Sequence, residues 1–184
     1  MNNVMLDIET IGNKPWSAIV SIGAVIFDPA SGQIHDQCFH QKINIASCLS
    51  AGLKMDTSTV LWWLRQSKEA QAVFDNNESE RNMNEVLQNL GIYFHDNIKG
   101  DAVVWGCGPS FDQTILRVAY ERVGLAAPWK FWNERCVRTM DFIAKQIKHP
   151  SRKEMAFDGV MHDALDDAKH QAKFVSSVLS KISA

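Results

Sequence analysis

Val4-Met5-Leu6-Asp7-Ile8-Glu9-Thr10 is an apolar run with two carboxylates set into it, and it has the length of a β-strand. Side chains alternate between the faces of a strand, so we expect Asp7 and Glu9 to point to the same face. Two like charges side by side repel each other, and a cation between them relieves that repulsion. Because Mg²⁺ and Mn²⁺ take carboxylate oxygens as ligands, the run is a candidate metal site. The alternative is a pair of acids at a strand end that simply face water.

The elements that follow predict an α/β fold. Two further strands, 18–27 and 33–43, joined by the turn-forming run 28–32, predict an antiparallel three-strand meander. Later segments alternate between helix and strand, which favours a mixed sheet with added parallel strands, flanked by helices. The predicted helices are 60–64 continuing over 68–74 (preceded by the capping hydroxyls of 57–59), 82–97, 112–123, 139–148 and 162–182, and the predicted strands are 102–106 and 129–132. No repeat or shift in composition divides residues 1–184, so we expect one domain.

Composition narrows the class of protein. With 46% hydrophobic and 22% charged residues, the sequence is typical of a folded globular protein rather than a disordered one. The net charge of -2 gives no overall basic field, so a nucleic acid would be held by a local patch or through metal. Four widely spaced cysteines match neither a zinc knuckle nor a disulfide scaffold. The absence of a signal sequence and of an 18-residue apolar run predicts a cytoplasmic protein without membrane contact.

Acids also appear at two later element ends. The apolar strand 102–106 runs into a glycine-rich turn and reaches Asp112 at the start of a helix. Binding sites in α/β sheets gather outside strand ends of this kind. The alternative is an aspartate that only stabilises the first turn of its helix through the helix dipole.

The third group of acids opens the last helix. On a helical wheel Asp163 and Asp166 lie about 150° from the centre of the apolar stripe, and Asp167 lies about 110° from it. Asp167 is therefore the aspartate best placed to lean towards the sheet, with Asp166 its rival. We expect His162 on the loop before the helix, where it could swing over a bound substrate.

Together these residues resemble the three motifs of the DEDDh group of 3′–5′ exonucleases, in the ribonuclease-H-like superfamily. The matching positions are Asp7-Ile8-Glu9-Thr10, Asp112 after an aromatic residue, and His162 with Asp167 five residues later. The run Ser21-Ile22-Gly23-Ala24-Val25 is also similar to the family. The small size and Trp62-Trp63 look most like the phage and bacterial members grouped with a mycobacterial-type exoribonuclease.

The resemblance implies a metal-dependent 3′–5′ exonuclease that releases 5′ mononucleotides from single-stranded RNA or DNA 3′ ends or overhangs. Asp7, Glu9, Asp112 and Asp167 would hold two Mg²⁺ or Mn²⁺ ions, Asp7 would bridge them, and His162 would be the general base. Asp163 and Asp166 would assist from outside or face solvent. The preference between RNA and DNA stays open, with a slight lean to RNA. The oligomeric state is open too, and a homodimer is the arrangement many relatives adopt.

Substrate contacts follow from the position of aromatic and basic residues. Thr10 lies in the first motif, Trp16 lies in the loop after it, and Phe111 precedes Asp112, so these three are the candidate substrate-binding residues. Ordinary half-buried aromatics are the alternative for Trp16 and Phe111. We expect Trp62, Trp63 and Trp105 in the core, and the basic residues at 145, 148, 152 and 153 either on the substrate backbone or merely in solvent.

Two other classes of function remain open at this stage. An endonuclease of the same superfamily would need the acids but not His162 as a base. A non-catalytic binding module could retain the scaffold, although such a module would usually have lost at least one of the five motif residues.

Overall fold

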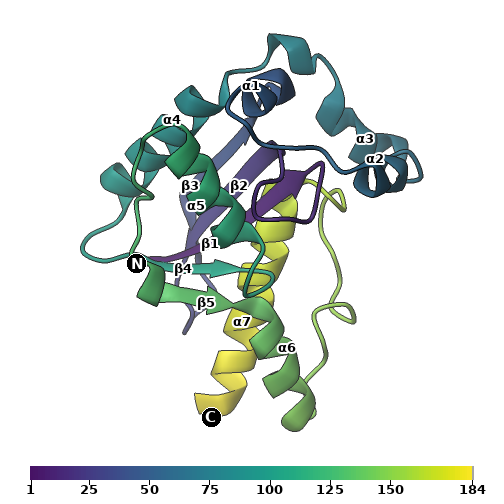
Figure 1. The fold of residues 1–184 in the computed structure, drawn as a ribbon. Helices are drawn as coiled ribbons and strands as arrows, with labels where there is room; N and C mark the ends of the chain where they lie inside the picture. The colour runs from purple at the N-terminus through teal and green to yellow at the C-terminus, as the bar shows by residue number, and fades with distance from the viewer. Residues whose placement is uncertain (184) are drawn as a thin grey trace.

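A mixed five-stranded sheet forms the centre of the protein, which we describe from a computed structural model for residues 1–183 (Figure 1). The strands are β1 (Asn3–Thr10), β2 (Ile19–Phe27), β3 (Ile34–Lys42), β4 (Val103–Gly106) and β5 (Glu134–Cys136). Their order is β3-β2-β1-β4-β5, with β1, β2 and β3 antiparallel and β4 and β5 parallel to β1. The predicted meander with added parallel strands is confirmed, and the motif strand β1 is its central strand.

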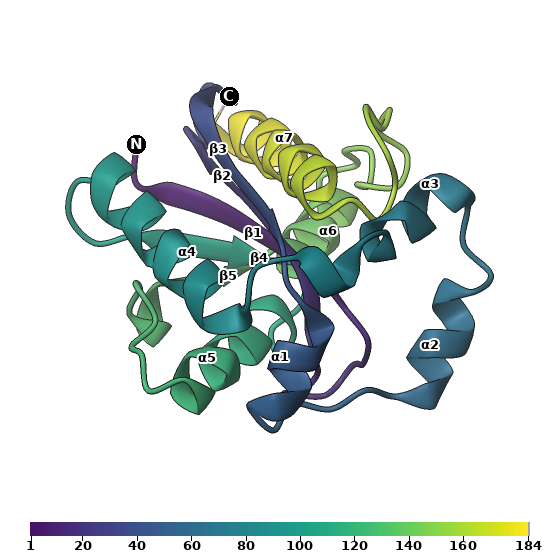
Figure 2. The same ribbon diagram turned by 90° about the horizontal axis from the view of Figure 1, so that it is seen from above.

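Helices cover both faces of this sheet (Figure 2). The α-helices are α1 (Ile45–Ser50), α2 (Thr57–Trp63), α3 (Lys68–Gln71), α4 (Met83–Asn97), α5 (Asp112–Arg122), α6 (Val137–Gln146) and α7 (Ala164–Ser183). Three short 3-10 turns are η1 (Ala72–Phe74), η2 (Asn77–Ser79) and η3 (Phe131–Asn133). None of the described helices is both long enough and apolar enough to cross a membrane.

Alternation along β1 separates the two hydrophobic cores. Val4, Leu6 and Ile8 pack with α4 and α5 on one face, whereas Met5 packs with α6 and α7 on the other. Asp7 and Glu9 continue the second series, so their carboxylates point to the face that α7 covers.

Gly23 lets α7 lie unusually close to that face. It is the cross-strand partner of Asp7, and a Cβ on Gly23 would stand 2.2 Å from the carbonyl carbon and oxygen of Ala164. Real Cβ atoms do not approach backbone at that distance, so any larger residue here would push the start of α7 outward. The family-like run around Gly23 therefore sets the distance between the first and last motifs.

The segment α2–α3 stands out beside the end of β1 and the start of α7 (Figure 2). A small apolar cluster of Ile11, Val20, Trp63, Ala70 and Val73 fixes this segment to the sheet. The helix predicted to continue from 60–64 over 68–74 is interrupted: Ser67 caps the new helix α3 by accepting from Ala70 N–H, and residues 72–74 form the 3-10 turn η1.

Some predicted local details are wrong. The strand expected at 129–132 is a buried Trp129 followed by η3, and the strand that pairs with β4 begins at Glu134. The side chain that caps α2 is Asp56, not a hydroxyl of 57–59, and α1 was not expected. Trp62, expected in the core, is 41% exposed, whereas Trp63 and Trp105 are buried as expected.

Candidate active site

Asp7 and Glu9 line the floor of the site. Both side chains are buried, on the β1 face that α7 covers. Gln171, one helical turn after Asp167 on α7, donates its Nε2 hydrogen to Asp7 Oδ1 over 2.7 Å. The Gln171 side chain is itself buried, and its Oε1 atom has no hydrogen-bond partner among the described residues.

Asp112 enters from the first turn of α5. The glycine-rich turn after β4 brings the Cys107 N–H within 2.6 Å of Asp112 Oδ2, and the carboxylate is almost fully buried. A carboxylate that only capped its helix would face the solvent, so the burial of Asp112 favours a role in the site.

Asp167 and His162 close the site from the start of α7. The backbone N–H of His162 donates to Asp167 Oδ2 over 2.8 Å. His162 lies on the loop just before the helix, with a left-handed φ of 66°. One ligand atom from each of Glu9, His162 and Asp167 lies within 4.8 Å of the others. The first and last motifs thus meet at one site, and Asp112 of the second motif is close enough for its charge to raise the pKa of Asp7 and Glu9.

The electrostatics of this pocket disfavour four free carboxylates. Burial raises the pKa of Asp7 well above its usual value, and the charges of Asp112, Glu9 and Asp167 raise it further. Burial and then Asp167 raise the pKa of Glu9, burial raises the pKa of Asp112 to about 6, and burial also raises the pKa of Asp167. Burial is thus the main cause of the raised pKa in all four acids, and neighbouring carboxylates add to it at Asp7 and Glu9.

A divalent cation fits this donor set. Clustered carboxylate oxygens are ligands that Mg²⁺ and Mn²⁺ accept, and an added positive charge would stabilise the ionised carboxylates that burial disfavours. We therefore take the cluster of Asp7, Glu9, Asp112 and Asp167 as a candidate metal centre, and we call these four residues the acid cluster.

A family model described as 3′-5′ exoribonuclease Rv2179c-like domain matches residues 2–179. The chain belongs to this family. It is therefore a 3′–5′ exonuclease, and the family implies dependence on a divalent metal.

Individual proteins that resemble this chain are also exonucleases, in agreement with the family match. An exodeoxyribonuclease of Enterobacteria phage T4 is 25% identical over 191 residues, which cover 91% of this chain and 84% of the phage protein. Among solved structures, the nuclease domain of 3′hExo, a DEDDh family member bound to rAMP, matches with a TM-score of 0.63 and 15% identity over 96% of this chain and 90% of that chain. E. coli Exonuclease I with a dA16 oligonucleotide matches with a TM-score of 0.65 and 13% identity, over 95% of this chain and 40% of that chain.

These two structural likenesses show the fold, which is the ribonuclease-H-like fold predicted from the sequence. The DEDDh resemblance and the grouping with the mycobacterial-type exoribonuclease are likewise confirmed.

The neighbouring aspartates of the exonuclease stand outside the acid cluster. Asp163 caps α7 by accepting from the N–H groups of Leu165 and Asp166, and its other oxygen lies 3.5 Å from His40 Nε2. Asp166 accepts from the Val160 N–H and pairs with Lys169. The wheel that favoured Asp167 over Asp166 agrees with this geometry.

Two residues near the site were missed in the sequence. Trp62 lies edge-to-face on His162 with 4.9 Å between ring centroids, and the Trp63 ring centroid lies 6.1 Å from the same His162 ring. Adjacent helical residues point about 100° apart, so Trp62 and Trp63 could not both face the core. The sequence alone could therefore have predicted one exposed tryptophan on this helix. Gln171 is the other missed residue, and its position one turn after Asp167 was the signal.

The predicted substrate-binding residues lie in three different surroundings. Thr10 is buried beneath the site, where its hydroxyl donates to the Gly12 carbonyl and its own carbonyl accepts from Trp63 Nε1. Trp16 is 46% exposed on the loop after β1. Phe111 is partly buried against the core beside α5. Their contact with substrate stays a prediction.

Basic groups approach the acid cluster from one side. The charge of Arg138 lowers the pKa of Asp112, and Arg152 and His170 lower that of Asp167, although burial outweighs these effects. Of the basic run predicted on the last loop, Arg152 is the half-buried residue, and it pairs with Asp141 on α6. Lys145, Lys148 and Lys153 do not form ion pairs within residues 1–183.

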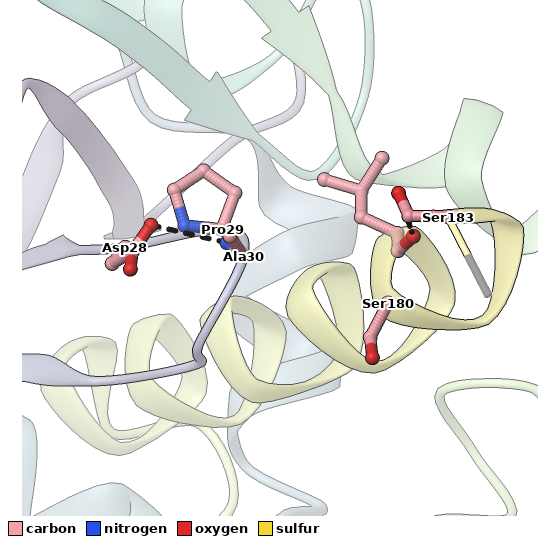
Figure 3. Close-up of a pocket in the computed structure, with 6 residues that line it drawn as sticks. Asp28, Pro29, Ala30, Ser180 and Ser183 are labelled. Atoms are coloured by element: carbon pink, nitrogen blue, oxygen red, sulfur yellow. Dashed lines mark hydrogen bonds between the residues drawn. The ribbon is translucent and has the colours of Figure 1, made fainter.

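A hollow of about 570 Å³ lies at the other end of α7, lined by Asp28, Pro29, Ala30, Leu179, Ser180 and Ser183 (Figure 3). More than ten helical residues separate it from Asp167, a distance of roughly 20 Å at 1.5 Å per residue. It therefore takes no part in the acid cluster.

Proposed function

We propose that the exonuclease removes nucleotides one at a time from the 3′ end of single-stranded nucleic acid or a 3′ overhang, releasing 5′ mononucleotides with two Mg²⁺ or Mn²⁺ ions. The observation that carries the proposal is the convergence of Asp7, Glu9, Asp112 and Asp167 with His162 at one pocket. Phosphodiester hydrolysis requires that added negative charge be neutralised, and two bound divalent ions supply that.

Each residue of the pocket has a separate task in this proposal. The four carboxylates of the acid cluster would hold the metal ions, which would supply positive charge to the phosphate under attack. Gln171 fixes the orientation of Asp7, because its N–H is committed to one of the two Asp7 oxygens. The rings of Trp62 and Trp63 limit the movement of His162, because both pack edge-to-face against its ring.

His162 is the proposed general base. It accepts a proton from the attacking water as the new oxygen–phosphorus bond forms and the bond to the leaving 3′ oxygen breaks. An imidazole changes charge near neutral pH and can hold this proton at low cost. The Asp167 carboxylate accepts a hydrogen bond from the backbone N–H of His162, and this bond fixes the loop that carries the imidazole ring.

Both RNA and DNA remain proposed substrates, with RNA placed first. The matching family model is described as an exoribonuclease, whereas the phage T4 relative is an exodeoxyribonuclease. The choice depends on contacts to the terminal 2′-hydroxyl, so RNA and DNA strands of the same sequence should be compared directly.

The decisive experiment follows 3′-labelled and 5′-labelled 15-nucleotide strands with Mg²⁺, Mn²⁺ or EDTA. We expect a 5′-labelled ladder that shortens from the 3′ end, complete loss with EDTA, and loss of at least about 1000-fold in Asp7→Ala. His162→Ala should lose about 100- to 10,000-fold. Asp166→Ala is the matched control, because this neighbouring acid lies outside the acid cluster.

Other outcomes would point to other functions. Internal cuts that survive His162→Ala would favour an endonuclease. Binding without cleavage under every metal condition would favour a non-catalytic module and contradict the proposal.

Compartment and assembly are also proposals. We place the protein in the cytoplasm, in keeping with its four free cysteine thiols. We propose that the protein is a homodimer, because many relatives are homodimers. Measurement of its molecular mass in solution would test this.

A further inference from the structure

The exposed residues between positions 130 and 138 are all aromatic or cationic. None of them belongs to the three site motifs. They are Lys130, Phe131, Trp132, Arg135 and Arg138, and we call them the β5 strip. The chain as a whole has a net charge of -2, so this run of exposed cations is a local positive region. It lies along β5, the outer strand of the sheet, and continues into α6 (Figure 1).

The two aromatic rings of the strip face solvent. Phe131 is 63% exposed and Trp132 is 61% exposed, and their ring centroids lie 4.9 Å apart in an edge-to-face arrangement. Lys130 Nζ lies 5.8 Å from the Trp132 ring. Large aromatics left in water without a core partner indicate a binding surface more often than a packing need.

Two of the three cations of the strip, Arg135 and Arg138, are available for a polyanion. Arg135 donates only to the main-chain carbonyls of Trp132 and Glu134, and neither Arg135 nor Arg138 forms an ion pair within residues 1–183. The nearest acids are already engaged. Glu134 accepts from Trp129 Nε1 and pairs with Arg117, and Asp101 pairs with Lys130.

The strip leads to the acid cluster. The last residue of β5, Cys136, pairs with Gly106 at the end of β4, where the turn to Asp112 begins. The Arg138 guanidinium lies against Gly108 in that turn. From Trp132 to Arg138 the chain spans at most about 20 Å, the length of a few stacked nucleotides.

We propose that the β5 strip binds the nucleotides upstream of the bond being cleaved, with bases stacked on Phe131 and Trp132 and phosphates against Arg135 and Arg138. Aromatic platforms beside cations bind single strands without reading their sequence, because every base has a π-face. The inference rests on the proposed function, since it assumes a single strand whose 3′ end lies in the acid cluster.

The test is the double substitution Phe131→Ala with Trp132→Ala, compared on a 15-nucleotide strand and on a dinucleotide. We expect kcat/KM on the long strand to fall about tenfold or more, mainly through KM, because stacking is lost. The dinucleotide cannot reach the strip, so its cleavage should be unchanged. Ile92→Ala, which removes an exposed apolar side chain from α4, is the control and should affect neither substrate.

A binding measurement separates this inference from the proposed function. In the Asp7→Ala background, anisotropy of a labelled 15-nucleotide strand should show an affinity about tenfold weaker when Phe131 and Trp132 are both replaced. If wild type cleaves the strand and the double variant has the same kcat/KM on both substrates, the proposed role of the β5 strip is wrong and the exonuclease function stands. If wild type cleaves neither substrate, the exonuclease function itself is wrong.

A second copy of the chain is the rival occupant of the strip. Light scattering would reveal it as a dimer of wild type that becomes a monomer in the double variant. That result, with unchanged strand affinity per site, would overturn the proposal in favour of an oligomer interface.

Discussion

Gln171 holds the orientation of the carboxylate at the floor of the acid cluster. Its side-chain N–H reaches Asp7 across the gap between α7 and β1, and this contact lowers the Asp7 pKa against burial and three neighbouring acids. A side chain with these properties decides which Asp7 oxygen is free for a ligand.

Replacing Gln171 should therefore weaken metal binding more than folding. In Gln171→Leu, Asp7 loses its donor, and we expect Mn²⁺ affinity to fall about 10- to 100-fold. Calorimetric titration with Mn²⁺ measures this directly. Lys173→Ala on the exposed side of α7 is the control. An unchanged Mn²⁺ affinity in the Leu variant would show that Asp7 is held by the backbone alone.

At the level of single residues, the sequence predicted the motif positions but not their partners. Asp7 and Glu9 share a face because strand alternation is strict, and Asp167 was separated from Asp166 by its angle to the apolar stripe. Gln171 and Trp62 were missed because their importance depends on contacts with Asp7 and His162, which lie far away in sequence.

The packing of α7 on the sheet sets the geometry of the site at the scale of elements. The backbone of Ala164 and Leu165 rests directly on Gly23, opposite Asp7. Three residues further along the helix, Asp167 is thereby placed over β1. The closeness of helix and strand, rather than any loop, joins the first and last motifs.

Gly23→Ala should test this. The new methyl group cannot fit against Ala164, so α7 must move outward and carry Asp167 and His162 with it. A displacement of about 1 Å costs on the order of 100-fold in rate, and we expect a loss of that size in kcat with a lowered Tm.

The matched control is Gly91→Ala on α4, where an added Cβ meets no atom within 4 Å. This change should leave kcat alone and stabilise the protein by about 1 kcal/mol, because alanine favours a helix over glycine. Equal activity of the two variants would mean that the start of α7 adjusts freely.

Element types were easier to predict than their ends. Periodicity predicted the first four strands, but the fifth was predicted at 129–132, whereas β5 is Glu134–Cys136. Its true position depends on pairing with β4, a contact between segments about thirty residues apart that no local pattern carries. The six-residue α1 was missed because it is too short to show a period.

For the molecule as a whole, the acid cluster opposes stability when no metal is bound. Burial raises the pKa of each member above its unfolded value, so the folded state binds more protons than the unfolded state between those values. Stability from such groups is present at low pH and is lost as pH rises through the folded pKa. For Asp112, with a usual value of 3.8 and about 6 here, the loss is on the order of 3 kcal/mol.

Without metal, the Tm should therefore fall between pH 5 and pH 7. The acids with lowered pKa values, such as Asp28 and Asp56, titrate below this window and do not reverse the trend. Added Mn²⁺ should raise the Tm strongly at pH 7.5 and little at pH 5, where protons compete for the same oxygens. Thermal unfolding with EDTA or Mn²⁺ at each pH measures both effects.

Asp112→Asn is the control for this pH dependence. Removing one charge from the cluster should raise the metal-free Tm at pH 7 and shrink the gain from Mn²⁺. A metal-free Tm that rises from pH 5 to pH 7 would contradict the electrostatic account.

The spacing of the acids along the chain has a consequence for biosynthesis. The ribosome makes β1 first, but β1 gains its last carboxylate neighbour only when α7 has emerged and settled onto Gly23. Until then a nascent polypeptide carries Asp7 and Glu9 without Asp167 and His162. The full set of motif side chains therefore exists only after the last helix has been made.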